Sequence, residues 1–485
     1  MALNPGIIAI AVGILSVLFF LWRKADASLD PDEPPIVLSR IPFIGHILGL
    51  VRYQIGYFEN LSRTTHPVFT LKIFDSRIYV VKSPEYVALT LREWKTLTFD
   101  PFTTAFVKNA LGAPPDVVEV FEKTMYLTEI HTKMHGALSI GPDLAKSNVR
   151  VLNVLARYLV PQETNLYSLL REAYTIAMGE AFYGPDNPVP GLIDEIWDFE
   201  DDLGLMMIGF FQRIVARKAC RGQKRVSKAF KAYYDAGLDK NANELIQGRA
   251  RIARAYNLDN TALGIFEMAI CFAPITNVVP TVFWMLTYIY ADADLLRALR
   301  HELAFLGNPL DTDKLRSCPL LISTFQEIQR LKQHGNAVRW VSADTRLDGY
   351  LLKKGAVMQI PSSVLNTASS VWGPDAGSFN ARRFLDLDDK KTRQRGYIPF
   401  GGGRNLCPGR HLAFTEALGF VAAFVLGFDM QGAKIIGART HKIGFGARKP
   451  ERDLKVSIRR RAGFEDAKWS FNVGGERDAA PEQNV

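Results

Sequence analysis

Cysteine is scarce in this chain, and none of the cysteines stands close to another. The 485 residues contain only four, Cys220, Cys271, Cys318 and Cys407. They form no CxxC pair and have no tight spacing with histidine, which argues against a disulfide framework and against a zinc ribbon. A reducing compartment therefore fits the sequence best.

Other absences narrow the range of partners. No internal repeat is apparent, and no basic run is interleaved with aromatic residues in the way that is typical of nucleic-acid binding. The formal net charge is nevertheless +9, which suits an anionic membrane surface or an acidic protein partner. We therefore expect no nucleic-acid partner. The length allows one large domain or several ordinary ones.

Charge is absent from the apolar stretch Ile7 to Trp22, which Arg23 and Lys24 follow directly. At ~1.5 Å per residue this stretch is slightly short for a hydrocarbon core of ~30 Å. A cleaved signal peptide carries its positive charge before the apolar run, so the order found here favours a retained signal anchor. We expect a single membrane anchor over residues 1–24, with the following chain in the cytosol.

The segment after this anchor is rich in proline. Residues 25–45 include four prolines, which cannot continue a helix. They predict a stiff elbow that keeps the body of the protein close to the membrane. The body is expected over residues 46–462, and the polar residues from 463 to 485 predict a mobile tail.

The body begins with strand-like segments and continues with helical ones. Pro67–Phe74 and Arg77–Ser83 are rich in β-branched and aromatic residues and predict a hairpin. Long helical patterns dominate from about Pro84 to Arg330. Within them, Leu263–Tyr290 carries only one charge, Glu267. Because this run also contains two prolines, we interpret it as a buried helix that crosses the core, not as a second membrane span.

Two other segments allow more than one interpretation. Asp100–Pro115 is typical of an apolar loop or a short helix. Arg213–Arg254 carries many basic residues among scattered aromatics. Solvated helix faces are the simpler explanation of this composition, and contact with lipid or with a partner is the alternative.

One cysteine stands in a glycine-rich setting, the stretch FGGGRNLCPGRHLAF from Phe400 to Phe414. The glycines let the backbone approach something flat or large and adopt positive φ angles. Pro408, directly after Cys407, favours the first position of a helix, and Gly409–Leu426 has a helical composition. Cys407 is therefore predicted at a helix N-terminus, where free N–H groups and the helix dipole stabilise a thiolate.

Such a thiolate can act as a nucleophile or as a metal ligand. A nucleophile needs a histidine partner, and His411, on the same helix, is poorly placed for that role. A phosphate-binding loop would need Gly-Lys-Ser/Thr, which is absent here. An iron ligand needs only one thiolate if a macrocycle supplies the other positions.

Four spaced positions of this stretch, Phe400-x-x-Gly403-x-x-x-Cys407-x-Gly409, resemble the haem-binding loop of the cytochrome P450 family. The resemblance implies haem b as the cofactor and Cys407 as the axial ligand of its iron. It also implies that Gly403 lets the loop lie against the porphyrin and that Phe400 packs beside the thiolate. Arg339, in NAVRWV, matches a position that often contacts a haem propionate.

Further segments match the family in the expected order. Glu327-Ile-Gln-Arg330 resembles its ExxR helix, whose i, i+3 spacing puts both side chains on one face. Asp348–Gly355 resembles a short strand and turn of the family. Val371–Phe384 resembles the segment whose arginine, here Arg383, completes an ion-pair triad. By this resemblance the triad Glu327, Arg330 and Arg383 is structural and not catalytic.

With the anchor, the resemblance covers most of the chain. It implies a fold class that is mainly α with small β-sheets, a cytochrome P450 fold behind an N-terminal transmembrane helix. Residues 46–462 would be the catalytic domain. The implied location is the endoplasmic reticulum membrane, with the catalytic domain in the cytosol.

The chain departs from the family pattern in three respects, of which the first two concern the haem propionates. Asn405 stands where most members have an arginine or histidine for a haem propionate. The helix that usually supplies tryptophan and arginine to a propionate is not recognisable. Within Tyr126–Leu138, Lys133 or His135 can do this, but an exposed helix face explains the segment equally well.

The third departure concerns the central helix. Members of the family usually place an acid and a threonine there, which relay protons to dioxygen. In this chain Thr276 stands at the place of the acid and Asn277 at that of the threonine, and we take both as candidate catalytic residues. Asn277 can hydrogen-bond dioxygen, a water molecule or a substrate oxygen. Alternatively, it satisfies the backbone of a helix kinked near Pro280.

The pattern A-x-x-x-N-x-x-P-x-x-F-W of this helix resembles one branch of the family, prostacyclin synthase and the bile-acid hydroxylases that act on sterol rings. Some members of this branch use dioxygen and electrons, whereas others rearrange an oxygenated substrate without either. Asn277 therefore leaves both reactions open. A haem sensor or carrier without turnover is an alternative of another class.

The sequence thus predicts a fungal monooxygenase that inserts oxygen into a large apolar substrate, such as a terpenoid, polyketide or alkaloid of secondary metabolism. Electrons would come from NADPH through NADPH–cytochrome P450 reductase, which would dock near Arg404 and Arg410. The rival prediction is an isomerase or dehydratase of the same fold that needs no reductase. The substrate pocket is expected from Phe102–Val107, Phe272–Asn277 and Ala337–Val341.

Overall fold

The computed structural model describes the larger part of the chain, namely residues 30–39, 45–53, 55–61, 64, 66–73, 76–333, 335–387, 391, 394–439 and 446–474, with Gly13, Ser16, Val17 and Phe20 before them. Apart from these four positions, the expected membrane anchor lies outside the described residues, and so does part of the expected elbow. The chain forms two compact units.

The first unit comprises Met1–Pro101, His334–Gly377 and Asp389–Leu406. Its centre is a five-stranded sheet of order β1-β2-β9-β6-β3. β2 and β9 run parallel, and the other neighbours run antiparallel. The strands of this sheet are β1 (Val68–Ile73), β2 (Ser76–Val81), β3 (Leu97–Thr98), β6 (Asn336–Val341) and β9 (Val357–Pro361).

The pairing of β1 with β2 confirms the predicted hairpin. Its β-branched and aromatic side chains, among them Val68 and Tyr79, enter a buried cluster with Met358 of β9. A two-stranded sheet and short helices complete the unit: β7 (Thr345–Leu347), β8 (Tyr350–Leu352), α2 (Gly45–Tyr53), α3 (Ile55–Leu61), α4 (Pro84–Arg92), α19 (Ser362–Asn366), α20 (Ser369–Trp372) and the 3-10 turn η6 (Gly403–Asn405).

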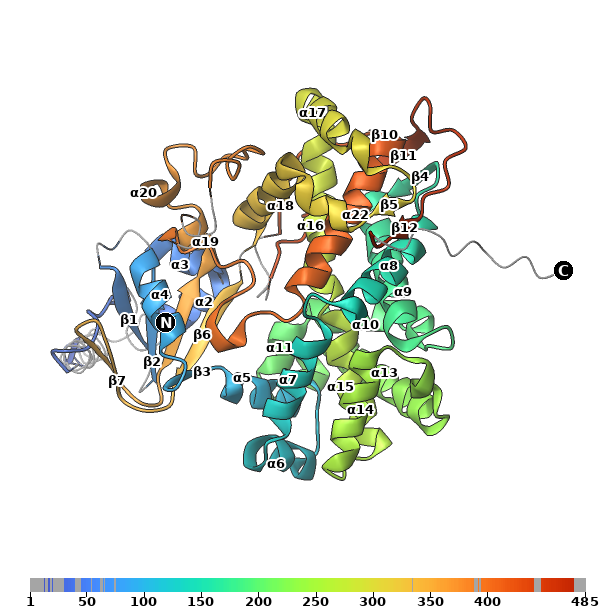
Figure 1. The fold of residues 1–485 in the computed structure, drawn as a ribbon. Coiled ribbons are helices and arrows are strands. Elements are labelled where there is room, and N and C mark those ends of the chain that lie inside the picture. Colours follow the sequence, from blue (N-terminus) through green and yellow to red (C-terminus); the bar gives the residue numbers. More distant parts are fainter. Residues whose placement is uncertain are drawn as a thin grey trace, which may run out of the picture. The chain divides into compact units, whose positions relative to one another are not determined.

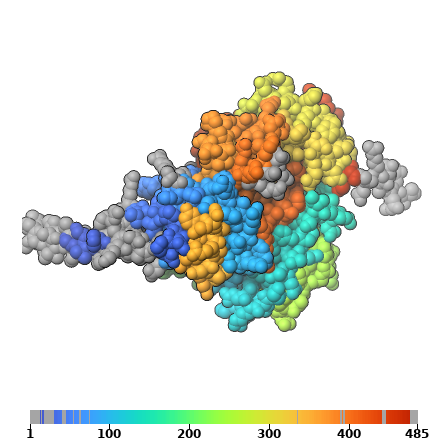
Figure 2. Space-filling view, turned by 60° about the vertical axis from the view of Figure 1, so that its left-hand side comes forward, coloured from blue at the N-terminus to red at the C-terminus, as the bar shows by residue number. Residues whose placement is uncertain are grey.

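Ion pairs join the start of the described chain to the β7–β8 ribbon. Arg346 Nη2 lies 2.6 Å from Asp32 Oδ2, and Lys353 Nζ lies 2.9 Å from Asp30 Oδ2. The same neighbourhood is visible in Figure 2, where the dark blue segment near residue 30 lies beside the gold segment near residue 350.

The second unit comprises Phe102–Gln333, Ser378–Asp388 and Cys407–Val485 and is mainly helical. Its α-helices, beginning with one that crosses the unit boundary, are α5 (Asp100–Ala105), α6 (Pro115–Lys123), α7 (Tyr126–Ala137), α8 (Pro142–Ala156), α9 (Leu166–Tyr183), α10 (Ile193–Asp201), α11 (Leu203–Met207), α12 (Gln212–Val215), α13 (Arg217–Asp235), α14 (Glu244–Ala255), α15 (Asn260–Phe272), α16 (Ile275–Tyr290), α17 (Ala293–Leu303), α18 (Pro319–Lys332) and α22 (Arg410–Gly427).

Two small sheets and short helical turns complete this unit. One sheet has the order β10-β11-β4, and the other pairs β12 with β5. These elements are β4 (Gln162–Asn165), β5 (Leu310–Asp311), β10 (Phe428–Gln431), β11 (Lys455–Arg460), β12 (Phe471–Asn472), the π-helical turn η1 (Phe106–Ala110) and the 3-10 turns η2 (Val189–Gly191), η3 (Leu238–Asn241), η4 (Ala304–Leu306) and η5 (Asp313–Ser317).

The core of this unit is built around α16, which packs against α9, α18 and α22 (Figure 1). Its residues 278–289 are buried without exception. A mainly helical protein with small sheets is therefore what the structure shows, as the sequence predicted.

The central helix differs from the prediction in one respect. The run Leu263–Tyr290 is not one helix, because Ala273 and Pro274 interrupt it between α15 and α16. Pro274 has no N–H for the carbonyl four residues earlier, and its ring clashes with that carbonyl. The expected disturbance at Pro280 is thus found six residues earlier, and Pro280 itself lies inside α16.

By length and composition, two stretches of the described chain could cross a membrane, Asn260–Tyr290 and Arg410–Gly427. Their most apolar windows are 56% and 78% buried within the protein, as expected of core helices. This burial agrees with the interpretation of Leu263–Tyr290 as a core segment.

The C-terminal segment corrects another expectation. Residues 463–474 are not a mobile tail, because β12 pairs with β5 and both Trp469 and Phe471 are buried. These two aromatic side chains give the segment apolar surface to bury, which its mostly polar composition conceals. Residues 475–485 lie outside the described part of the chain.

Candidate functional site

Cys407 precedes α22, the helix that the sequence predicted. The helix begins at Arg410 with Gly409 as its N-cap, so Pro408 lies just outside the helix and not at its first position. The thiol is half-buried. Arg410 Nη1 donates to the Cys407 carbonyl oxygen at 3.1 Å, which fixes the backbone at the point where a ligand would be presented.

Burial raises the pKa of the Cys407 thiol, against the Gly409 N–H and the charge of Arg410, which lower it. The predicted stabilisation of a thiolate by the helix N-terminus is therefore outweighed by desolvation. A bound metal ion reverses this balance, because a coordinating thiol is deprotonated outright.

The other three cysteines are Cys220, Cys271 and Cys318, which lie outside the glycine-rich loop. Burial raises the pKa of each thiol, and each is a free cysteine. In the described part of the chain, no group of three or more His, Cys, Asp or Glu side chains could hold a metal ion. A site that uses several protein ligands is therefore not found among these residues, whereas one thiolate can complete a metal held by a macrocycle.

The glycines before Cys407 belong to the first unit. They let the backbone of this loop lie close to the backbone of α4. Gly401 and Gly403 have φ angles of +73° and +64°. A Cβ atom at Gly403 would lie 2.6 Å from the Leu91 carbonyl oxygen of α4. Glycine is thus required at position 403 both by its φ angle and by the space available.

Arg339, on β6, lies against the same loop. Its Nη2 donates to the Gly402 carbonyl oxygen at 3.1 Å, and its Nη1 donates to the Val338 carbonyl oxygen at 2.7 Å. The residue is buried, and burial lowers the pKa of its guanidinium. A guanidinium has five N–H donors, so these two bonds leave it able to bind a carboxylate. Phe400 is half-buried in the same unit.

The structure brings Glu327, Arg330 and Arg383 together in the second unit. Arg330 binds Glu327 through two hydrogen bonds, from Nε at 2.7 Å and from Nη2 at 2.8 Å. Arg383 Nε donates to Glu327 Oε1 at 3.1 Å, and the Asn380 N–H donates to the same oxygen at 2.9 Å. Glu327 and Arg330 are fully buried, so this paired network ties the segment around Arg383 to α18.

Asn277 and Thr276 point to different partners. Asn277 Oδ1 accepts a hydrogen bond from the Ala447 N–H at 2.9 Å, and Gly446 is so close that a Cβ there would lie 1.6 Å from Asn277 Oδ1. Thr276 Oγ1 donates to Glu200 Oε1 of α10 at 2.8 Å. The asparagine is therefore held by the backbone of the C-terminal segment, and the threonine by a carboxylate that the sequence did not single out.

The region around the helix break is accessible. Ala273 is exposed, and Phe272, Thr276 and Asn277 are half-exposed, in contrast to the buried residues that follow. Phe272 packs against Phe106 and Phe199 with ring centroids 6.1 and 5.5 Å apart. Two of the three predicted pocket segments thus meet at Phe106 and Phe272. The third, Ala337–Val341, lies within strand β6 of the first unit.

The two candidates for a propionate contact on α7, Lys133 and His135, differ in whether they already have a partner. Lys133 Nζ is bound to Glu244 Oε1 of α14 at 2.5 Å. His135 Nε2 is buried and has no hydrogen-bond partner within the described residues. Burial lowers the pKa of His135, and the charge of Arg410 lowers it further. His135 therefore senses the charge of Arg410 at the start of α22, and its Nε2 is a buried polar atom without a partner among the described residues.

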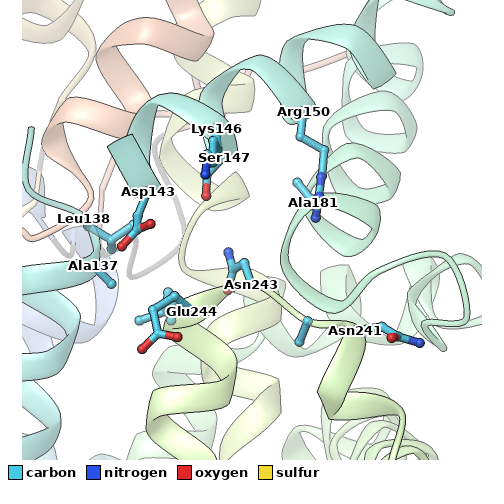
Figure 3. Close-up of a pocket in the computed structure, with 12 residues that line it drawn as sticks. Ala137, Leu138, Asp143, Lys146, Ser147, Arg150, Ala181, Asn241, Asn243 and Glu244 are labelled. Carbon is cyan, nitrogen blue, oxygen red and sulfur yellow. The ribbon is translucent and has the colours of Figure 1, made fainter. Parts of the chain in front are cut away.

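A separate pocket of about 180 Å³ lies between the α7–α8 corner, α9 and the start of α14 (Figure 3). Its polar lining includes Lys146, Arg150, Asp143 and Glu244. Pockets for small molecules usually measure ~300–1,000 Å³ and are mostly apolar. This pocket is therefore too small and too charged for a large apolar substrate.

Comparison with known proteins agrees with the site. The model of the family "Cytochrome P450" matches residues 214–456, a range that includes Thr276, Glu327, Arg383 and Cys407. A cytochrome P450 monooxygenase of Hypoxylon pulicicidum, nodJ, is 30% identical, over 93% of this chain and 94% of its own length. The chain belongs to the cytochrome P450 family. It is an oxidoreductase of the monooxygenase type.

Other relatives of this P450 show the same relationship at full length. A cytochrome P450 monooxygenase of Gibberella zeae is 29% identical, over 98% of this chain and 99% of its own length. The cholesterol 7-alpha-monooxygenase of Cricetulus griseus is 22% identical, over 82% of this chain and 87% of its own length. The first two relatives are fungal, and the third belongs to the sterol-hydroxylating branch to which the central-helix pattern pointed.

Family membership implies a haem, and the residues of this P450 fit one. In the second unit, Cys407 offers a single thiol, and His135 has a buried nitrogen without a partner among the described residues. In the first unit, Arg339 offers further N–H donors from a buried guanidinium. A haem carries two propionates, which are the partners that such donors require. The sequence pointed to all three residues, but only the structure distinguished His135 from Lys133.

Proposed function

We propose that this P450 is a haem-thiolate monooxygenase with Cys407 as the axial ligand of the haem iron. The observation that carries the proposal is the half-buried Cys407 thiol directly before α22, with its carbonyl bound by Arg410, in a member of the P450 family. When bound, the haem supplies an iron whose thiolate ligand favours O–O cleavage. Phe400 and Gly403 are the further residues of its loop.

The remaining site residues have distinct roles in this proposal. Arg339, in the first unit, has free N–H donors suited to a propionate, and His135, in the second unit, is a candidate for the same role. Glu327, Arg330 and Arg383 hold the segment that leads toward the haem loop, because breaking a buried ion pair leaves an uncompensated charge. Thr276 and Asn277 line the oxygen side.

The substrate in this proposal is a large apolar molecule, such as a terpenoid, polyketide or alkaloid of fungal secondary metabolism. The aromatic cluster of Phe106, Phe199 and Phe272 next to the accessible helix break supports an apolar substrate. The fungal relatives support the assignment to secondary metabolism. Electrons come from NADPH through a reductase that docks at basic residues, of which Arg404 is exposed and Arg410 half-buried.

The proposal includes attachment to the endoplasmic reticulum membrane through residues 1–24, the proline elbow 25–45 and a cytosolic catalytic domain over 46–462. A second membrane contact is supported by an apolar tip, which we define as residues 208–215. Ile208, Phe210, Phe211, Ile214 and Val215 are 44%, 65%, 70%, 77% and 48% exposed there. The exposed basic residues of α12 and α13 beside the tip suit an anionic lipid surface.

Replacement of the ligand tests the proposal. Cys407→Ser should abolish the red-shifted carbon monoxide band of the reduced protein and reduce product formation to background. Cys220→Ser is the matched control, because Cys220 is also half-buried, and it should keep both. A Cys407→Ser protein that retains the band or the activity would falsify the ligand assignment.

One observation favours a second candidate function, an isomerase or dehydratase of the same fold. Asn277 replaces the threonine of the family, and its side chain already accepts the Ala447 N–H. Product formation with and without NADPH and reductase separates the two functions. Monooxygenation requires both additions, whereas rearrangement of a peroxide or another oxygenated substrate proceeds without them.

A further inference from the structure

Thr276 connects the accessible part of the central helix to a chain of charged side chains. Its hydroxyl donates to Glu200 Oε1 at 2.8 Å. The other carboxylate oxygen, Glu200 Oε2, is bound by Lys449 Nζ. Lys449 Nζ also lies 2.8 Å from Asp201 Oδ1. An alcohol, a carboxylate and an ammonium group are therefore joined in series by direct hydrogen bonds.

This series leads from the interior toward solvent. The side chains of Glu200 and Lys449 are 13% and 15% exposed, whereas those of Asp201 and Arg439 are 30% and 42% exposed. Arg439 Nη1 lies 3.6 Å from Asp201 Oδ1. Protons from solvent can thus reach Lys449 at one end, and Thr276 stands beside the helix break at the other end.

Two further polar side chains near this series, Arg171 and Tyr167, come from α9. On α9, Arg171 lies 4.5 Å from the Trp197 ring, over which Lys449 also lies at 5.8 Å. Tyr167, also on α9, has a buried hydroxyl without a hydrogen-bond partner in the described chain. Burial raises the pKa of the Tyr167 hydroxyl, and the charge of Asp201 raises it further, whereas the charges of Arg171 and Arg439 lower it.

Lys449 is suited to exchange a proton near neutral pH. Burial lowers the pKa of its ammonium group to about 7, and the charge of Arg171 contributes to this. Glu200 and Asp201 act in the opposite direction by pairing with the ammonium. An ordinary lysine titrates near ~10.4, so most lysines cannot release a proton under these conditions.

We infer that Glu200 and Lys449 form an acid–base pair that delivers protons to Thr276 Oγ1. Lys449 Nζ gives a proton to the Glu200 carboxylate. The Thr276 hydroxyl, which donates to Glu200 in the structure, turns and gives its proton to a water molecule at the helix break. The protonated Glu200 carboxyl replaces that proton on the Thr276 oxygen. Lys449, left as a neutral amine, regains a proton from solvent. Glu200 and Lys449 thereby supply the acid that α16 itself lacks.

This inference rests on the proposed monooxygenase function. Monooxygenation consumes protons as well as electrons, because one oxygen atom enters the substrate and the other leaves as water. The electrons come from the reductase. If protons arrive too slowly, partly reduced oxygen leaves the enzyme as peroxide. The ratio of product formed to NADPH consumed therefore measures how well Glu200 and Lys449 deliver protons.

The first test needs no turnover. The rate of amine labelling of Lys449 in the full-length holoenzyme is measured by mass spectrometry as a function of pH. We expect half-maximal reactivity near pH 7, where the ammonium titrates. In Glu200→Gln the midpoint should fall, because the ammonium loses a stabilising carboxylate. A midpoint near ~10, as for an exposed lysine, would contradict the acid–base pair.

The second test measures product and peroxide per NADPH. Glu200→Gln and Thr276→Val should each lower product formation about 100-fold, at the lower end of what general acid–base groups contribute, and peroxide should rise. The double variant should lose no more than either single variant, because both break one path. Thr276→Ser and Glu200→Asp should recover part of the loss.

Asp201→Asn is the matched control, since Asp201 also pairs with Lys449, whereas Glu200 is the residue that accepts the Thr276 hydroxyl. It should keep the ratio of product to NADPH. If Glu200→Gln and Asp201→Asn behave alike, the pair is merely structural and the inference is wrong, although the monooxygenase stands. If the wild-type protein lacks the thiolate-type band, the proposed function and the inference both fall.

Discussion

Three fully buried carboxylates in this P450 differ in whether a positively charged side chain pairs with them. Glu267, Glu327 and Glu416 are all fully buried. Glu327 is paired with two arginines, and Glu267 with Arg249 and two tyrosines. Both carboxylate oxygens of Glu416 lack a hydrogen-bond partner within the described chain. Burial therefore raises the pKa of Glu416 well above its usual value.

The stability of the protein should depend on pH through Glu416. Its pKa is higher in the folded state than the ~4.3 of an unfolded chain, so the favourable contribution is complete below that value and is lost as pH rises toward the folded pKa. Glu416→Gln should leave the free energy of unfolding unchanged near pH 4 and raise it near pH 8. Urea unfolding at both pH values measures this difference.

An exposed carboxylate provides the comparison for Glu416. Glu119→Gln changes a side chain that is 59% exposed and paired with Lys123, and such surface pairs contribute ~0–1 kcal/mol. Its effect on unfolding should be small and similar at both pH values. An equally small and pH-independent effect of Glu416→Gln would show that the Glu416 carboxyl finds a partner that stabilises its charge.

At the scale of elements, the two halves of the central helix are anchored separately. Glu267 of α15 binds Tyr183 of α9, Tyr234 of α13 and Arg249 of α14. α16 instead packs against α9, α18 and α22, and Thr276 and Asn277 bind α10 and the C-terminal segment. The break at Ala273 and Pro274 thus divides a segment whose parts have different partners.

The apolar tip, residues 208–215, should enter the lipid surface of a membrane-bound protein. In the full-length protein, tryptophan at position 210 (Phe210→Trp) should add fluorescence that brominated lipids quench, because brominated chains lie where the tip inserts. Phe305→Trp is the control, as Phe305 is 50% exposed but lies on η4, away from the tip in sequence. Equal quenching of both variants, or of neither, would contradict insertion of the tip.

At the scale of the whole molecule, the formal net charge of +9 favours association with acidic surfaces. Exposed Arg404 stands in the loop before Cys407, with its guanidinium 5.4 Å from the Trp94 ring. In the proposed function, charges of this kind accelerate the encounter with an acidic reductase. Salt screens them, since the Debye length falls from ~10 Å at ~0.1 M to ~3 Å at ~1 M.

Electron transfer from the reductase should therefore slow at least several-fold between these salt concentrations. The measurement is the rate at which the carbon monoxide band forms after mixing with reductase and NADPH. Reduction by dithionite, which needs no docked protein, is the control and should change little. Arg404→Ala should weaken the salt dependence. A rate that does not respond to salt would exclude electrostatic docking.

Local patterns determined much of this protein from the sequence alone. The β1–β2 hairpin and the helix after Cys407 follow from the composition of short segments, and the shared face of Glu327 and Arg330 follows from helical periodicity. The Cys407 loop also identified the family, because its spacing is fixed along the chain. The break at Pro274 was missed because Pro280 offered the same local signal.

Only the tertiary structure decided which distant side chains meet. Thr276 and Glu200 are 76 positions apart, and Glu200 and Lys449 are 249 apart. No periodic pattern links such positions, because their contact depends on how α10, α16 and the C-terminal segment pack around one core. The sequence located the threonine where an acid was expected, and the fold supplied the acid from another helix.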